Sequence, residues 1–157
     1  MSQIEGLDET TSLVLLSEIG LDMRRWPTVQ HCTAWLGLCP HQRVSGGKGL
    51  SRRTTSCANR AATALRVAAA ALHHSQSAFG AFFRRMKARL GAPKAITATA
   101  HTLARLVYTM LKHGTADVRR GMDEYAQQDR DRVVKPMTRR AKALGYTLVK
   151  APEGAAV

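Results

Sequence analysis

The chain has 157 residues, of which 45% are hydrophobic and 5% aromatic, and its formal charge is +13 at pH 7. This length and composition predict one modest folded domain, and the charge favours a polyanionic partner, with nucleic acid ahead of an anionic membrane. No run of 18 apolar residues occurs, which argues against a transmembrane helix, and the acidic first residues do not fit a signal peptide. The three cysteines are irregularly spaced, which argues against a disulfide scaffold. We therefore expect a cytoplasmic protein without a membrane partner.

The first two predicted elements form a helical hairpin. Apolar spacing from Thr10 to Ile19 predicts a helix that is capped by Asp8 or Thr10 and ends at Gly20. Pro27 precedes a second short helix, which we expect over about residues 28–37. Its mostly apolar character predicts that the two helices pack together through an apolar core. Trp26 and Trp35 could stack on bases, but their place in this hairpin favours a role in its core.

Residues 40–56 have no helical periodicity and are rich in Gly, Ser, Thr and Arg, which predicts an ordered loop or a short β-ribbon. Within it, Ser45 precedes two glycines whose backbone N–H groups can surround an anion. The Ser45 hydroxyl could hold a phosphate or attack one, and the residues alone leave both roles open. Ser51 and Ser56 are weaker candidates for the same role. The loop also carries positive side chains that could stabilise a phosphate, namely Lys48, Arg52 and Arg53.

Three further helices are predicted, over about residues 59–74, 78–90 and 94–113, and their apolar faces predict a packed three-helix core. The stripe formed by Phe79, Phe82 and Phe83 is typical of a core face. The fold class is therefore all-α. The serine-bearing, DNA-binding domain is expected over residues 1–114, and residues 115–157 are expected to form a charged tail that is partly helical or disordered.

The positive charge is concentrated in the middle of the chain. Residues 21–92 contain twelve Lys and Arg against one acidic residue, whereas residues 1–20 contain four acidic residues and no Lys or Arg. The middle segment is therefore the expected nucleic-acid-facing part. Its helical candidates for phosphate contact are Arg60, Arg66, Arg84, Arg85, Lys87 and Arg89.

A zinc site is a weaker reading of His31, Cys32, Cys39 and His41. Their spacing matches no standard zinc knuckle, and both cysteines fit the apolar hairpin instead. We therefore expect no metal site and no cofactor in this chain.

Several segments occur in an order that resembles a known family. They are Leu13 to Gly20, Arg25-Trp-Pro27, Ala34-Trp-Leu-Gly-Leu-Cys-Pro40, Ser45-Gly-Gly47, Asn59 to Ala71, and Leu103-Ala-Arg105 to Gly114. Together they are similar to the C-terminal transposase domain of the insertion-sequence 110/116/902 family, over about residues 4–115. The resemblance implies that the family's nucleophilic serine falls on Ser45. It also implies a separate resolvase-like domain with four metal-binding acids, which we expect to lie outside this chain with its Mg²⁺ or similar divalent metal.

The resulting functional hypothesis is DNA transposition. The chain would bind transposon-end DNA, Ser45 would attack a phosphodiester once the metal-binding domain is supplied, and the chain by itself would be inactive. A homo-oligomer and, in some members, a guide RNA are partners that the resemblance implies. The alternative is a truncated, non-enzymatic nucleic-acid-binding module or a transposase relic. One departure from the family is Asp8, which stands where a glycine is usual in the entry to the first helix and would repel a phosphate.

Overall fold

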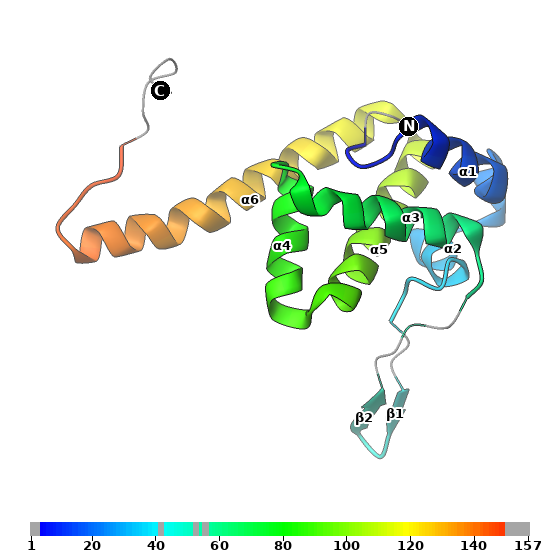
Figure 1. The fold of residues 1–157 in the computed structure, drawn as a ribbon, viewed down its shortest axis with the longest axis horizontal. Coiled ribbons are helices and arrows are strands. Elements are labelled where there is room, and N and C mark those ends of the chain that lie inside the picture. The colour runs from blue at the N-terminus through cyan, green and yellow to red at the C-terminus, as the bar shows by residue number, and fades with distance from the viewer. Residues whose placement is uncertain (1–3, 41–42, 52–53, 55–56, 150–157) are drawn as a thin grey trace.

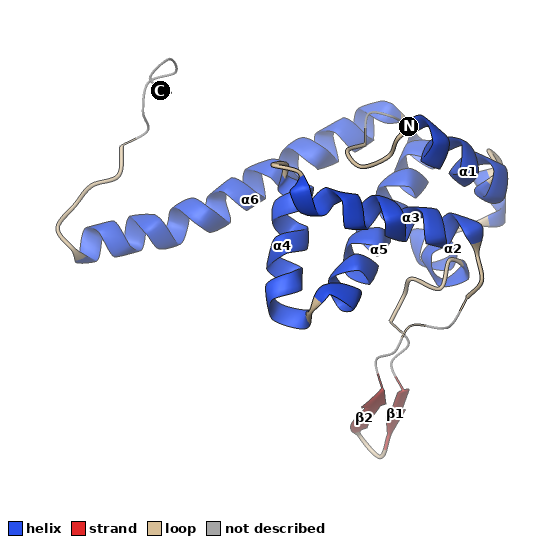
Figure 2. Ribbon diagram, viewed as in Figure 1, coloured by secondary structure: helices blue, strands red, loops and turns tan. Residues whose placement is uncertain are grey.

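The computed structural model describes residues 4–40, 43–51, 54 and 57–149, and in these ranges the fold is built almost entirely of helices (Figure 2), which confirms the all-α class. The elements in chain order are α1 (Glu9–Ile19), the 3-10 turn η1 (Met23–Arg25), α2 (Val29–Trp35), β1 (Arg43–Ser45), β2 (Lys48–Ser51), α3 (Arg60–Ala71), the 3-10 turn η2 (Leu72–His74), α4 (Ala78–Leu90), α5 (Ala92–His113) and α6 (Thr115–Ala143).

Polar side chains fix where four of the helices begin. A side chain that accepts a hydrogen bond from a first-turn N–H satisfies a donor that the helix itself cannot pair. Of the two caps expected for α1, Asp8 is the one used, and its carboxylate accepts from the Thr11 N–H at 2.7 Å. The corresponding caps are Thr28 for α2, Asn59 for α3 and Ser77 for α4.

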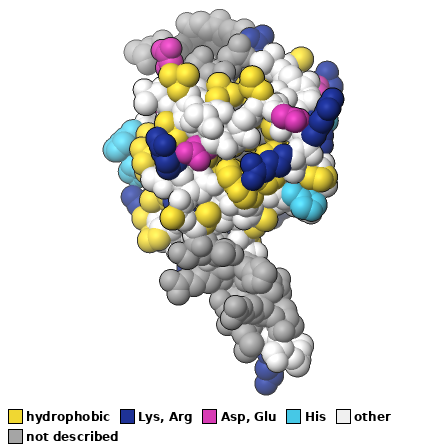
Figure 3. Space-filling view, turned by 90° about the vertical axis from the view of Figure 1, so that its right-hand side faces the viewer, with side chains coloured by type: hydrophobic (Ala, Val, Ile, Leu, Met, Phe, Trp, Pro, Cys, Tyr) yellow, Lys and Arg dark blue, Asp and Glu magenta, His cyan; other side chains and the backbone are white. Residues whose placement is uncertain are grey.

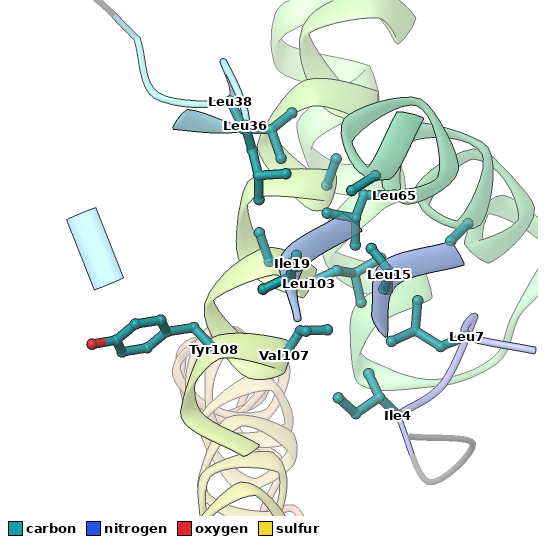
Figure 4. Packing of buried hydrophobic residues seen from close by; sticks show 14 of the residues in the cluster. Ile4, Leu7, Leu15, Ile19, Leu36, Leu38, Leu65, Leu103, Val107 and Tyr108 are labelled. Carbon is teal, nitrogen blue, oxygen red and sulfur yellow. The ribbon is translucent and has the colours of Figure 1, made fainter. Parts of the chain in front are cut away.

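The core lies where α5 crosses α3, with α1 packed on α3 and with α2 and α4 packed on α5 (Figure 1). Figure 4 shows Leu65 of α3, Leu103 and Val107 of α5 and Leu15 of α1 pointing toward one another, and each of these side chains is fully buried. Alanines fill the rest of the α3 contact face and let the helices approach closely. The predicted packing of the three central helices is thus confirmed, and the helical hairpin closes one side of the same core.

Tyr108 joins the end of α5 to the start of α2. Its hydroxyl donates to the carbonyl oxygens of Trp26 at 3.0 Å and Pro27 at 3.3 Å. The Lys112 ammonium donates to the Tyr108 hydroxyl and to the Pro27 carbonyl, at 2.7 Å in both cases. Trp26 itself is buried against Trp35, with 4.8 Å between ring centroids, so its predicted core role is confirmed.

We expect Tyr108→Phe to lower the free energy of unfolding by about 1–2 kcal/mol, because it leaves the buried Trp26 carbonyl without that donor. The measurement is urea denaturation followed by far-UV circular dichroism. Tyr146→Phe is the matched control, because Tyr146 is exposed, and it should change the free energy of unfolding by less than about 0.5 kcal/mol. An equal loss in the two variants would contradict the role given to the Tyr108 hydroxyl.

Within the segment 115–157, expected to be a partly helical or disordered tail, Thr115–Ala143 form one helix, α6, of 29 residues. Residues 144–149 follow it without helix, and residues 150–157 lie outside the described residues. Its first half packs on the body. Val118 is buried, and the Tyr125 ring stacks on Phe79 with 5.1 Å between centroids and 12° between planes. Phe82 meets the same ring edge-on. Phe79 and Phe82 of α4 therefore form a docking face for α6, whereas the buried Phe83 meets the ring of His73 edge-on, with 5.7 Å between centroids.

The second half of α6 extends away from the body (Figure 1). From Arg132 to Leu144 every residue is exposed except the half-buried Thr138 and Ala141. None of the helices in the part of the chain that the structure describes combines the length and apolar character needed to cross a membrane.

Candidate nucleic-acid interface

The serine-glycine segment forms the tip of a two-stranded antiparallel β-hairpin that projects from the helical body (Figure 1). Of the two structures expected for it, the short β-ribbon is the one observed. Gly46 and Gly47 form the two-residue turn, with φ of 56° and 75°. Two successive positive φ angles are characteristic of the type I′ turn, whose twist matches that of the flanking strands, and glycine adopts them without strain.

The register of the hairpin places Ser45 directly opposite Lys48. Directly opposed residues in an antiparallel pair have their side chains on the same face, with Cβ atoms about 5 Å apart. The Ser45 hydroxyl and the Lys48 ammonium therefore share one side of the tip. All four residues from 45 to 48 are exposed, and the structure shows no hydrogen bond from Ser45 Oγ to another described residue. The tip can therefore meet a large ligand without rearranging the core.

Four residues that the sequence places near Ser45 lie outside the described residues, namely Arg52, Arg53, His41 and the rival Ser56. The backbone of Ser51 ends β2, where it pairs with Arg43 next to a bulge. Ser45 and Lys48 are thus the predicted site residues that the described part of the hairpin brings together.

A small polar cluster supports the chain just before the hairpin. The Cys39 thiol lies 3.0 Å from the Thr33 hydroxyl on α2 and 3.7 Å from Nε2 of His101 on α5. Pro40, the next residue, pairs with Thr54 as an isolated bridge. The cluster therefore ties the base of the hairpin to two helices. Cys32 is buried nearby in α2, and burial raises the pKa of its thiol to about 11, which agrees with a core role rather than a reactive one.

His101 gives the stability of the fold a pH dependence. Partial burial, and to a lesser extent the charge of Arg105, lower the pKa of His101. The folded state then binds a proton less readily than the unfolded state, so this contribution to stability is present above the ordinary histidine value of about 6.5 and is lost as the pH falls below it.

We expect the thermal midpoint of the wild-type chain to fall between pH 7 and pH 5, and the fall to be smaller in His101→Gln. Scanning calorimetry across this range checks the expectation. His113→Gln changes an exposed histidine at the end of α5 and serves as the control. The same pH slope in wild type and His101→Gln would show that His101 is not the group responsible.

The predicted phosphate-contacting residues on the helices differ in whether their side chains already form hydrogen bonds or ion pairs within the protein. Arg84 Nη1 donates to the carbonyl oxygens of Ser75 at 2.6 Å and His73 at 3.2 Å, so this guanidinium holds the η2–α4 connection. Arg85 is half-buried and ion-paired with Asp129 of α6. Both side chains have structural partners that a phosphate would have to replace.

Of the other four candidates, Arg60, Lys87 and Arg89 are exposed. Arg60 is 78% exposed and only loosely paired with Glu18 at 3.6 Å. Lys87 is exposed, its ammonium lies 3.2 Å from Nε2 of His73, and its charge is the main cause of a lowered His73 pKa. Arg89 is exposed and Arg66 is half-buried. DNA contact by these residues stays a prediction, and the structure places them on α3 and α4 rather than beside Ser45.

Figure 3 shows the face of the body nearest α1, where Lys and Arg side chains are mixed with acidic and apolar ones rather than gathered in one patch. The densest basic segment that the sequence reasoning passed over is the projecting half of α6. Residues 130–144 contain six Lys and Arg against one acidic residue. Acidic and basic residues alternate in the first half of the same helix, so the net charge over the whole helix is small. Counting charge over residues 130–144 alone would have identified the basic segment.

The described residues contain no group of three His, Cys, Asp or Glu side chains placed to hold a metal ion. The divalent metal that the resemblance implies therefore has no fitting ligand set in this part of the chain.

Comparison with known proteins gives one family. The model of the Transposase IS116/IS110/IS902 family matches residues 1–84, slightly more than half of the chain, which takes in α1 to α3, the β-hairpin and the first part of α4. No curated protein and no solved structure matches this chain. The sequence resemblance also took in residues 85–115, which the family model does not cover. With the serine-bearing β-hairpin and its flanking helices inside the matched range, the chain belongs to the Transposase IS116/IS110/IS902 family.

Proposed function

We propose that this chain is the DNA-engaging part of a transposase and that its hairpin tip carries Ser45 to a DNA phosphate. The observation that carries the proposal is the exposed Ser45 hydroxyl at the tip of a projecting hairpin, with Lys48 opposite it in register. Membership of the transposase family supports a role in DNA transposition. The chain's charge of +13 supports a polyanionic partner.

The proposed step is an exchange of ester bonds at phosphorus. Ser45 Oγ attacks a DNA phosphodiester, a bond from Oγ to phosphorus forms, and the bond from phosphorus to one deoxyribose oxygen breaks. The hydroxyl proton passes to a base, and the departing deoxyribose oxygen takes up a proton. The Lys48 ammonium stabilises the negative charge that grows on the phosphoryl oxygens. The product is a phosphoserine link that a second strand can resolve.

A serine hydroxyl attacks slowly unless a base or a metal activates it. The described residues around Ser45 supply neither, and the chain contains no fitting ligand set for the divalent metal in its described part. The activating groups in this proposal therefore come from other residues or from another polypeptide, such as the acidic domain that the resemblance implies. We expect the purified chain to bind DNA without cleaving it.

Phosphate contact at the tip predicts a specific salt dependence. Each phosphate neutralised on duplex DNA contributes about 0.9 to the slope of log affinity against log salt concentration. We expect Lys48→Gln to weaken binding and to reduce this slope by about 0.9, as measured by fluorescence anisotropy with a labelled duplex. Lys94→Gln removes an equally exposed lysine at the start of α5 and should leave the slope unchanged. Equal slopes for wild type and Lys48→Gln would show that Lys48 does not contact a DNA phosphate.

A non-enzymatic nucleic-acid-binding module is the second candidate function, and the absence of an activating group beside Ser45 among the described residues favours it. Salt-sensitive binding cannot separate the two candidates. The separating experiment incubates the chain with transposon-end DNA, Mg²⁺ and the acidic domain of a family transposase, and then seeks a covalent protein–DNA adduct under denaturing conditions. An adduct through Ser45 supports the nucleophile, whereas binding without any adduct supports the module.

A further inference from the structure

A cluster of positive and titratable side chains lies at the corner where α3 ends and α4 begins (Figure 1). The Lys87 ammonium of α4 lies 3.2 Å from Nε2 of His73 in η2. The rings of His73 and His74 are 4.7 Å apart between centroids, and Arg84 donates to the His73 carbonyl oxygen at 3.2 Å. These four residues are termed the corner cluster. His74 and Lys87 are exposed and the other two are half-buried, so a ligand in solvent can reach the cluster.

No acidic residue balances the corner cluster within its own elements. Residues 23–116, which include all of α3, η2 and α4, contain no Asp or Glu. From α6, the Asp129 carboxylate reaches α4 but pairs with Arg85. In the part of the chain that the structure describes, no ion pair joins the cluster to an acidic residue. The cluster is therefore a concentration of positive charge without a counter-charge, which is the kind of surface that attracts an anion.

Among the described residues, the other elements near η2 add no acidic partner either. The helix α3 packs on η2 and carries Arg60 and Arg66. In the segment before α1, Glu5 lines a cavity together with Asp123 of α6, and no residue of the corner cluster lines that cavity. The charges that act on His73 all come from the cluster itself.

Hydrogen bonding sets the charge state of His73 in the free chain. An ammonium can only donate, so Nε2 of His73 accepts from Lys87 and carries no proton. The ring proton is then on Nδ1, which lies 3.5 Å from Nε2 of His74. The charge of Lys87, followed by burial and the charges of His74 and Arg84, lowers the pKa of His73. His73 is therefore neutral at pH 7, and its neighbours hold it in that form.

A phosphate at the corner cluster would reverse this balance. One phosphate oxygen would accept from the Lys87 ammonium, which leaves Nε2 of His73 free to take up a proton from solvent. The negative charge then favours the imidazolium form, because an opposite charge close to a histidine raises its pKa. His73 would become a second charged donor to the same phosphate, and hydrogen bonds between charged groups are the stronger kind. Binding of the anion is thus coupled to proton uptake.

We propose that the corner cluster binds a phosphate of a nucleic-acid backbone and that His73 takes up a proton as it does so. This inference rests on the proposed function for the nucleic-acid partner, and it adds a site, apart from Ser45, whose affinity depends on pH. A polymer is favoured over a free phosphate ion because the cluster is open to solvent, where a single small anion is held weakly. A nucleic acid bound elsewhere on the chain presents its phosphates to the cluster at a high effective concentration.

The first test is the pH dependence of DNA affinity, measured by fluorescence anisotropy with a labelled duplex at constant ionic strength. We expect the affinity of the wild-type chain to rise at least about threefold from pH 8 to pH 6, because the complex binds more protons than the free chain. His73→Gln keeps a polar side chain that does not titrate, and it should lose at least half of this rise in log affinity. His113→Gln, at an exposed histidine at the end of α5, is the matched control and should keep the full rise. Circular dichroism of each variant checks the fold.

The second test follows the protonation of the His73 ring by NMR. In the free chain the pKa of His73 should lie below the ordinary histidine value of about 6.5, and Lys87→Met should raise it, because the charge that lowers it most is removed. Bound duplex DNA should raise the pKa of His73 above that ordinary value. Inorganic phosphate at the same ionic strength should leave it unchanged.

The outcomes separate this inference from the proposed function. DNA binding that leaves the pKa of His73 unchanged, or the same pH dependence in His73→Gln as in the wild type, overturns the inference alone. An equal rise in the pKa with inorganic phosphate overturns the assignment to a nucleic-acid backbone. Absence of DNA binding at every pH contradicts the inference and the proposed function together.

Discussion

Ser45→Ala is expected to abolish the covalent protein–DNA adduct, with a loss of at least about 10³-fold when the metal-binding domain is supplied. The reason is chemical, because alanine has no atom that can form the bond to phosphorus. DNA binding should change little, since Lys48 and the basic residues of α3 and α4 remain. Denaturing gel electrophoresis of labelled DNA after incubation measures the adduct, and anisotropy measures binding on the same samples.

Two further variants make this result specific to the position. Ser51→Ala removes a rival hydroxyl from the same hairpin and should retain the adduct. Ser45→Cys keeps a nucleophilic atom at the tip and should restore an adduct at a reduced rate, now through sulfur. Full adduct formation by Ser45→Ala would refute the assignment, and the position of the linked residue, read by mass spectrometry, would identify the true nucleophile. Because Ser45 is exposed, its substitution by Ala or Cys should leave the fold intact, which circular dichroism of the same samples checks.

Gly80→Ala is expected to produce the largest loss of stability among the helix substitutions considered, at least about 3 kcal/mol. A Cβ atom added at Gly80 would lie 2.1 Å from the Ser75 carbonyl oxygen and 2.9 Å from that of Leu72. Both obstacles are backbone atoms, and Arg84 holds the Ser75 carbonyl in place. The start of α4 would have to move away from η2, which would disturb the packing of the aromatic stripe against α6.

The matched control is Gly121→Ala, which introduces the same methyl group into the interior of α6. A Cβ at Gly121 meets no atom within 4 Å. Alanine is a better helix former than glycine, so this variant should gain about 0.5–1 kcal/mol. Chemical denaturation should show a lower free energy of unfolding for Gly80→Ala and a higher one for Gly121→Ala than for the wild type. If Gly80→Ala lowers the free energy of unfolding no more than a substitution at an exposed site does, then the backbone between η2 and α4 can shift to accommodate the added methyl group.

Local chemistry in the sequence was enough to predict most of the helical fold. Asp8, Asn59 and Ser77 act as caps in the places where short polar residues precede apolar periodicity, and Gly20 and Gly114 end helices as expected. The helix α6 and its contact with the body were harder to predict from the sequence. α6 has few apolar residues, and its contact with the body depends on Tyr125 meeting Phe79 across a long separation in sequence, which no local pattern reveals.

The candidate site was predictable in its residues more than in its geometry. The composition of residues 40–56 indicated an ordered loop or a short β-ribbon, but the pairing of Ser45 with Lys48 depends on the hairpin register. Whether a basic side chain is available to a ligand could not be predicted at all. Arg84 and Arg85 look like the solvent face of an amphipathic helix, and their guanidinium groups are engaged by Ser75 and Asp129, which lie on other elements.

The four residues of the hairpin tip take no part in the packing of the helical body. All four are exposed, and a Cβ atom added at Gly46 or Gly47 would meet nothing within 4 Å. Substitution at Gly46 or Gly47 is limited by the positive φ angles of the turn, whereas substitution at positions such as Leu65 and Leu103 is limited by packing. The tip and the helical body can therefore be altered independently, so that a substitution confined to the tip reports on the tip alone and leaves the core as an internal reference.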